Sequence, residues 1–587
     1  MNHVDKVTNL SRRHFMSVAG GAAGLAALSA FGLSAARVES SPNISTIDID
    51  AIKSKNTDTD VLVVGSGMAG LFAAVKAHDA GARVVMVSKG RLGTSGQTPF
   101  ARGIFAYDHQ KEKMSIDQFV AGVSHSAIGT NNPVFTRQLA AHSLDRVNEL
   151  REWGFFDSPL YHNSFSKPIV EREIPIIERV MLTHLIEKNG RINGAAGFSL
   201  DEGTIHFFSA KSVILCTGAG GFKPNGFPIC DLTHDGTTMA YKIGAKVTGK
   251  EWNDGHPSNR KNPASVFSQW GGMLERPPGT TEISIRHDLG VDLNYGVYKN
   301  GPQTKESGRP MFIQEKVAGG PYRPEGFDKP AGPPGPPPGQ DNDRRPPGPG
   351  GGKSGKPPGM GGVPSGGASA GMSIHKAEGL VPINASGESN IQGLYAAGDA
   401  LGSHMAGGIY TQIGSSLAGS AVQGAIAGEA AASAVRDMGL PLISTAKRRQ
   451  VEAEIIAPLK RERGYSPAWV TQTLQSTMIP NFVLYVKKER LLTAALAYIE
   501  ELRDSHQPML IASDMHELRL AHETESMILN AEMKLRASIM RKESRCSHYR
   551  LDYPDVDRKE WDCWINLFKD SDGNMALEKQ FFDQWPS

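Results

Sequence analysis

The chain has 587 residues and a formal net charge of +2 at pH 7, so we expect no nucleic-acid partner on electrostatic grounds. Hydrophobic residues make up 39% and charged residues 21% of the chain, as in soluble globular proteins, and the length predicts several domains. The cysteines Cys216, Cys230, Cys546 and Cys563 form no CxxC or CxxCH motif, which excludes the usual signatures of a bound iron–sulfur cluster, c-type haem or cysteine zinc site, and we expect no metal site.

Residues 1–36 are predicted to be an export signal. An Arg-Arg-x-Phe pattern begins at Arg12, a Gly/Ala-rich apolar run follows, and small residues at Ser34 and Ala36 suit cleavage after Ala36. This arrangement is typical of twin-arginine signals. It predicts the twin-arginine export machinery as a partner and a periplasmic or other extracytoplasmic location. An uncleaved membrane anchor is the alternative, although the run is only weakly hydrophobic.

A βαβ pattern follows the signal. An apolar strand at Val61–Val64 leads into a GxGxxG loop, then an Ala-rich helical run and a second apolar strand at Arg83–Val87. Glycines at these positions let the backbone turn and approach a pyrophosphate, which then lies on the helix N-terminus. The pattern therefore predicts a dinucleotide site at Gly65, Gly67, Met68, Ala69 and Gly70.

Later segments favour FAD over NAD. The usual acid at the end of the second strand is replaced by Ser88, and a third strand within Ala210–Phe222 carries Gly218. "GLYAAGDA" at Gly393–Ala400 is an apolar strand ending beside Asp399. FAD-binding Rossmann-type proteins commonly carry such a strand late in the chain, with its acid on the ribityl hydroxyls, so the order of the segments predicts FAD.

Two stretches carry a resemblance to a known family. They are "SKGRLGTSGQTPFARGI" at Ser88–Ile104 and the Arg-x-Glu-Ser-Arg and Asp-Tyr-Pro motifs within His522–Ile565. The chain after the signal resembles the flavoprotein subunits of succinate dehydrogenase and fumarate reductase, a family that includes L-aspartate oxidase and the adenylylsulfate reductase alpha subunit. The C-terminal stretch is nearer to the adenylylsulfate reductase branch.

The resemblance implies an α/β fold with a Rossmann-type FAD-binding domain, an inserted capping domain and a helical C-terminal domain. The capping segment contains a Pro/Gly-rich stretch that cannot build a core and is expected to be disordered. The FAD-binding domain is expected in two segments, 57–250 and 376–436, on either side of the capping domain 251–375 with its insertion 324–371. The helical C-terminal domain is expected at 445–587.

The family alignment also places further cofactor contacts. Members of membrane complexes attach FAD covalently through a histidine, and Gly96 occupies that position here, which predicts non-covalent FAD. The additional cofactor-binding residues implied by the resemblance are Ser88, Lys89, Ser95, Gly96, Gly103, Ser416 and Leu417.

In the family, an arginine transfers a proton while two histidines and a second arginine hold substrate carboxylates. His256 in "KEWNDGHPSN" and His375 in "SIHKAEGLVPI" resemble the two histidines, and Arg309 in "ESGRPMF" resembles the proton-transfer arginine. Cations at these places stabilise the enolate-like charge that develops as hydride adds.

The second arginine is missing. The motif Gly-Ala-Asn-Arg-Leu-Gly-x-Asn-Ser-Leu places Gln412 on it, with Tyr410 nearby. A glutamine donates hydrogen bonds but cannot neutralise a carboxylate. Tyr410 either donates to a substrate carbonyl or is a packed core residue. The loop argues against a plain fumarate reductase.

The sequence therefore predicts an exported FAD-dependent reductase that transfers hydride from flavin N5 to an unsaturated C=C bond of a small organic acceptor. Electrons would arrive from a separate cytochrome, iron–sulfur protein or quinol oxidiser. Two alternatives stay open: an FAD-dependent dehydrogenase or oxidase, for example of a ring ketone, and a non-catalytic flavin electron-transfer subunit.

Overall fold

The computed structural model describes residues 48–100, 103–112, 114–157, 161–222, 232–252, 254–257, 280–283, 371–375, 378–402, 404–408, 415–479, 483 and 486–585. The predicted export signal, Arg309, Tyr410, Gln412 and nearly all of the insertion 324–371 lie outside these residues. The fold below is that of the unit Asp48–Ser587.

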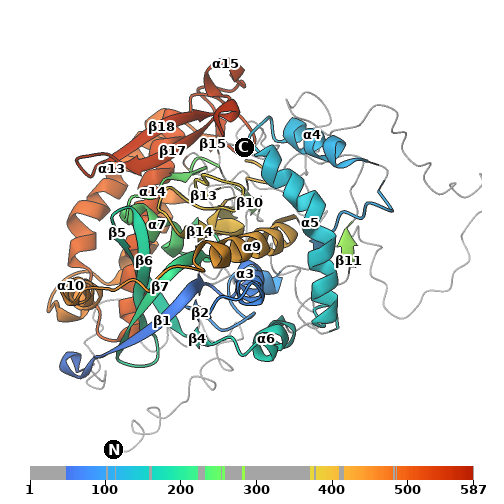
Figure 1. Ribbon diagram of the computed structural model, residues 1–587. Coiled ribbons are helices and arrows are strands. Elements are labelled where there is room, and N and C mark those ends of the chain that lie inside the picture. Colours follow the sequence, from blue (N-terminus) through green and yellow to red (C-terminus); the bar gives the residue numbers. More distant parts are fainter. Residues whose placement is uncertain are drawn as a thin grey trace, which may run out of the picture. The chain divides into compact units, whose positions relative to one another are not determined.

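A mostly parallel sheet forms the centre of the fold (Figure 1). β1 pairs in parallel with β2 on one side and β7 on the other, β2 continues to β4, and β14 joins the end of β7. The strands are β1 (Lys53–Val64), β2 (Val84–Ser88), β4 (Ile176–Glu178), β7 (Thr204–Leu215) and β14 (Leu394–Ala396). The βαβ unit and the later strands predicted from the sequence are present. β1 begins before its apolar part, and its first residues, Lys53–Asn56, are exposed.

Small residues bring two helices against each other beside this sheet. The helices are α3 (Met68–Asp79) and α9 (Ser415–Ala434). A Cβ on Gly424 would lie 2.2 Å from the Ala69 carbonyl oxygen, and one on Gly428 would lie 2.4 Å from that of Ala73. The backbones therefore touch directly, and a larger side chain at either glycine would push the helices apart.

An antiparallel extension continues the central sheet beyond β7. β5 (Val180–Lys188) pairs with β6 (Arg191–Ser199), which pairs with the first half of β7. The helices α4 (Ile116–Ser126), α5 (Pro133–Glu152) and α6 (Tyr161–Glu171) lie along the right and lower side of Figure 1, where α5 contacts α9 and α6 contacts α3.

The C-terminal region is mainly helical and also contributes strands. Its helices are α10 (Thr445–Ile456), α11 (Pro467–Met478), α13 (Glu489–Glu501) and α14 (Met515–Met540). The hairpin of β17 (Cys563–Lys569) and β18 (Met575–Phe581) joins β9 (Val247–Thr248) and β13 (Gly379–Leu380) in one sheet. Within the described residues, the helices all fall short of the length and apolarity that a membrane crossing needs.

A small sheet connects the capping segment to this framework. It contains β8 (Gly220–Phe222), β10 (Asp254–Pro257) and β12 (Gly371–His375) in the order β10-β12-β8. Both neighbours of β12 are antiparallel to it. The two ends of the capping segment are thus paired with each other and with a strand that follows β7.

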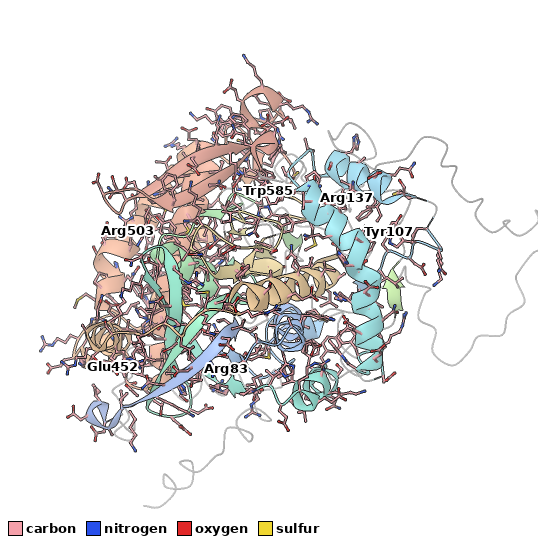
Figure 2. The ribbon with its side chains drawn as sticks, viewed as in Figure 1. Arg83, Tyr107, Arg137, Glu452, Arg503 and Trp585 are labelled. Atoms are coloured by element: carbon pink, nitrogen blue, oxygen red, sulfur yellow. The ribbon has the colours of Figure 1, made fainter. Side chains whose placement is uncertain are left out.

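Asp60 ties three strands of the central sheet together. Its carboxylate accepts hydrogen bonds from Arg83, which precedes β2 and is labelled in Figure 2. The carboxylate also lies 2.9 Å from Lys211 Nζ on β7. Burial alone raises the pKa of Asp60, but the bonds from Arg83 and Lys211 outweigh burial and lower it to about 2. The ionised carboxylate therefore stabilises the fold.

We expect Asp60→Asn to lower the free energy of unfolding by about 1–2 kcal/mol at neutral pH. Because the folded pKa lies below the unfolded value of 3.8, the contribution is present above pH 3.8 and is lost as the pH falls toward 2. Urea unfolding of both proteins at stepwise lower pH measures the difference. A difference that stays constant with pH would contradict this assignment.

Candidate cofactor site

A cavity that is open to solvent lies at the carboxyl ends of the central strands. Its walls include Val64 at the end of β1, Ser88 at the end of β2, Cys216 just after β7 and Ala397 just after β14. In open α/β sheets this edge is the position at which ligands bind.

The glycine loop between β1 and α3 forms the floor of the cavity. Gly65 has φ +108°, and a Cβ there would lie 2.2 Å from the Cys216 carbonyl oxygen. A Cβ on Gly70 would lie 1.9 Å from the Gly65 oxygen. Gly67 is the N-cap of α3 without a side-chain cap, and Met68 and Ala69 line the cavity. Backbone amides and the helix dipole at this end suit the pyrophosphate of FAD.

The end of β2 replaces the usual acid with a polar pair and a lysine. Ser66 and Ser88 share a hydrogen bond of 2.7 Å between their hydroxyl oxygens. Lys89 Nζ lies 2.7 Å from Asp235 and 2.8 Å from Glu523. The two carboxylates hold the Lys89 ammonium group at this wall of the cavity.

Asp399 reaches the cavity from the short 3-10 helix η5 (Gly398–Ala400). Gln97 Nε2 donates to Asp399 Oδ2 at 3.1 Å, which joins the loop after β2 to this segment. Gly96, beside Gln97, has φ +70° and nothing within 4 Å of a Cβ. These groups place a carboxylate and an amide where ribityl hydroxyls can be bound.

The structure brings most of the predicted cofactor residues together. Those lining the cavity are Gly65, Gly67, Met68, Ala69, Ser88, Lys89, Ser95, Gly96, Gly218 and Asp399. Gly70 lies directly behind Gly65, whereas Gly103 starts β3 (Gly103–Phe105) and Ser416 and Leu417 lie in the first turn of α9, outside the lining.

Other lining residues were not predicted individually from the sequence. They include Ser66, Gln97, Thr98, Val180, Met181, Leu182, Thr217, His234, Asp235, Met239 and Ser420. Ser66 and Thr217 flank predicted motif residues, so their neighbours point to them. The residues of β5 and α7 (Asp235–Lys242) reach the site only through the tertiary fold.

The backbone of one candidate histidine lies next to this site, and the other histidine belongs to the same small sheet. In the small sheet, His375 is paired with Gly220, which follows the cavity-lining Gly218 and Ala219. His256 is paired with Met372 on the same strand as His375. The strand register therefore brings both positions to one sheet that borders the cavity.

His234 lies between the cavity and this sheet. It lines the cavity, its side chain is fully buried, and Nδ1 is 2.7 Å from Glu378 Oε1. Burial lowers the pKa of His234, while Glu378 acts in the opposite direction. Among the described residues there is no group of three or more His, Cys, Asp or Glu side chains arranged to hold a metal ion.

Comparison with known proteins agrees with this geometry. The profile of the FAD binding domain matches residues 60–169, and that of the fumarate reductase flavoprotein C-terminal region matches residues 471–583. One chain of the fumarate reductase (CoM/CoB) of Methanothermobacter marburgensis is 25% identical over 592 residues, which cover 90% of this chain and 100% of that protein.

Solved structures share the fold. The apo Sdh1 complex of Mycobacterium smegmatis matches with a TM-score of 0.67 and 21% identity over 90% of this chain and 94% of that one. The adenylylsulfate reductase of Archaeoglobus fulgidus matches with a TM-score of 0.64 and 18% identity over 91% and 97%. The predicted fold class and the predicted cofactor, FAD, are confirmed. The chain therefore resembles the flavoproteins of succinate dehydrogenase and fumarate reductase, both in its FAD-binding and C-terminal regions and in its fold, and it is an FAD-dependent oxidoreductase.

Proposed function

We propose that this protein is an exported reductase that delivers hydride to a C=C bond of a small unsaturated acceptor other than fumarate. The observation that supports the proposal is the small sheet β10-β12-β8, in which His375 pairs with Gly220 beside the FAD cavity and His256 lies on the strand beyond β12. Bound FAD supplies the hydride at N5. The chain's own groups must then hold the acceptor, stabilise its developing negative charge and supply a proton.

The proposed roles follow from charge and register. His256 and His375 bind acceptor oxygens, and Arg309 supplies the proton and positive charge. Gln412 offers the acceptor a hydrogen bond without a positive charge. An acceptor with a carbonyl or amide at that end, rather than a second carboxylate, fits such a set. We further propose that a separate electron-transfer protein reduces the flavin and that the twin-arginine pathway exports the folded holoprotein.

The test is a turnover screen of unsaturated monoacids, enones, phenylpropanoids and fumarate with dithionite-reduced methyl viologen as donor. We expect one of the first three classes to exceed fumarate in kcat/KM. Arg309→Ala should lower kcat by about 10²–10⁴-fold, whereas Arg137→Ala, at an exposed position on α5, should retain wild-type turnover. Full activity of Arg309→Ala would remove the proton-donor assignment.

The direction of electron flow is tested with the same preparation. If the reduced flavin is reoxidised by oxygen faster than by every acceptor, the protein is an oxidase or dehydrogenase. If the flavin cycles normally with artificial donors but no acceptor is reduced, the chain is an electron-transfer subunit. Either result would replace the proposed reductase activity.

We also expect the FAD to be non-covalent, because Gly96 presents no side chain to the cavity. Acid precipitation of the holoprotein should leave the yellow flavin in the supernatant, where its absorbance is measured. Flavin that remains in the washed pellet would show a covalent link. A succinate dehydrogenase flavoprotein with a histidyl-FAD bond is the matched control.

A further inference from the structure

His234 has an unusual backbone and a defined place beside the cofactor. Its φ is +61°, in the left-handed region that a non-glycine residue rarely occupies, and it directly precedes α7. Such conformations cluster at functional sites, since the surrounding structure must enforce them. Its imidazole lines the FAD cavity and packs so closely on β8 that a Cβ on Gly220 would be 1.8 Å from Nδ1.

A buried polar cluster enforces this placement. It consists of His234, Lys250, Glu378 and Asn530. His234 Nδ1 is 2.7 Å from Glu378 Oε1, and Nε2 is 3.2 Å from the Asn530 amide nitrogen. Lys250 Nζ donates to Asn530 Oδ1 at 2.5 Å and lies 3.5 Å from Glu378. The side chains of His234, Lys250 and Glu378 are at most 2% exposed.

The cluster holds both ends of the capping segment. Lys250 comes four residues before β10, the strand of His256. Glu378 comes three residues after His375, the last residue of β12. Lys534 on α14 donates to the carbonyl oxygens of Lys250 and Trp252 at 2.8 and 2.7 Å. One set of buried contacts therefore holds the chain just before β10, the strand of His256, and just after β12, the strand of His375.

We propose that His234 is a positioning residue, which sets the strands of His256 and His375 relative to the bound flavin through Glu378 and Lys250. Its imidazole is the member of the cluster that lines the FAD cavity, so it links the cofactor to the strands that would hold the acceptor. The inference rests on FAD binding in the cavity described above and on the histidine roles proposed above. It does not depend on which acceptor is used.

His234→Gly is the main variant because glycine accepts φ +61° without strain. We expect kcat to fall about tenfold or more, since small displacements of reacting groups are costly, with FAD still bound. The flavin midpoint potential should shift by about 30 mV, a tenfold change in the two-electron reduction equilibrium. Added imidazole should restore part of both values by occupying the vacated space. His206→Ala, another buried histidine but outside the cavity lining, should change neither.

Glu378→Gln is the second variant, in case His234→Gly does not fold. It keeps the shape of the side chain and should shift kcat and potential measurably. Wild-type kcat and flavin midpoint potential in either variant would overturn the inference. A loss of kcat that His206→Ala reproduces, and that imidazole does not restore in His234→Gly, would also overturn it. If the wild type reduces no acceptor, the proposed function fails, and the potential and its response to imidazole still decide the role of His234.

Discussion

Replacing Gly65 by alanine is expected to abolish stable FAD binding. The added Cβ would lie 2.2 Å from the Cys216 oxygen and 2.7 Å from its carbonyl carbon, and φ is +108°. Both opposing atoms are backbone at the end of β7, so no side-chain rotation relieves the overlap. The ends of β1 and β7 would have to separate, and they form two walls of the cavity. We expect a loss of about 3 kcal/mol or more in FAD binding, over 100-fold in Kd.

Two other glycines separate the causes of this loss. Gly70→Ala places its Cβ 1.9 Å from the Gly65 oxygen without an unfavourable φ, whereas Gly81→Ala has φ +91° and open space around its Cβ. Titration of the apoproteins with FAD, followed by flavin fluorescence, should rank the three as Gly65→Ala weakest, Gly70→Ala intermediate and Gly81→Ala near wild type. Near-normal binding by Gly65→Ala would show that the loop does not need its observed shape.

The local parts of this fold were predictable because each has its own periodicity. The apolar runs at Val61–Val64 and Arg83–Val87 flank three glycines, and a strand–loop–helix–strand unit is the arrangement that buries both runs. The later strand with Asp399 and the helical C-terminal region were predictable for the same reason. The order of these segments along the chain also predicted the cofactor, because a late strand that ends beside an acid is typical of FAD-binding rather than NAD-binding proteins.

The rest of the cofactor site could not be predicted, because it depends on contacts between segments that lie far apart in the sequence. His234 lies in a stretch without a recognisable motif, and its partners Glu378 and Asn530 are 144 and 296 residues away along the chain. The hairpin β17–β18 follows a helical region and completes a sheet with β9. Nothing in local composition encodes such pairing. Arg309, Tyr410 and Gln412 remain predictions from the resemblance.

A second buried cluster lies next to the capping segment and depends on Arg541. Its guanidinium lies 2.9 Å from Glu251 and 2.8 Å from Glu543, and all three side chains have no exposed surface. It also donates to the carbonyl oxygens of Trp561 and Cys563, and stacks at 4.7 Å over Trp252. Burial lowers the pKa of Arg541, but Glu251 and Glu543 outweigh it, so its pKa is raised overall.

Arg541→Met is therefore expected to lower the free energy of unfolding by about 3–5 kcal/mol, because it removes the cation beside the buried Glu251 carboxylate, whereas Glu543 keeps its pair with Arg545. Urea unfolding at neutral pH measures the loss. Arg137→Met is the matched control: its pair with Asp117 is 2.6 Å long but 53% and 80% exposed, on α5 (Figure 2), so it should cost about 0–1 kcal/mol.

The double variant Arg541→Met/Glu251→Gln decides whether uncompensated charge causes the loss. Removing the carboxylate should return some of the stability that Arg541→Met loses, so the two changes should be non-additive by about 1–3 kcal/mol. Additive losses would instead assign the effect to the packing of Arg541 on Trp252. Trp252 lies two residues before β10. That result would therefore show that packing on the Trp252 ring, rather than the ion pair with Glu251, holds the chain before the His256 strand.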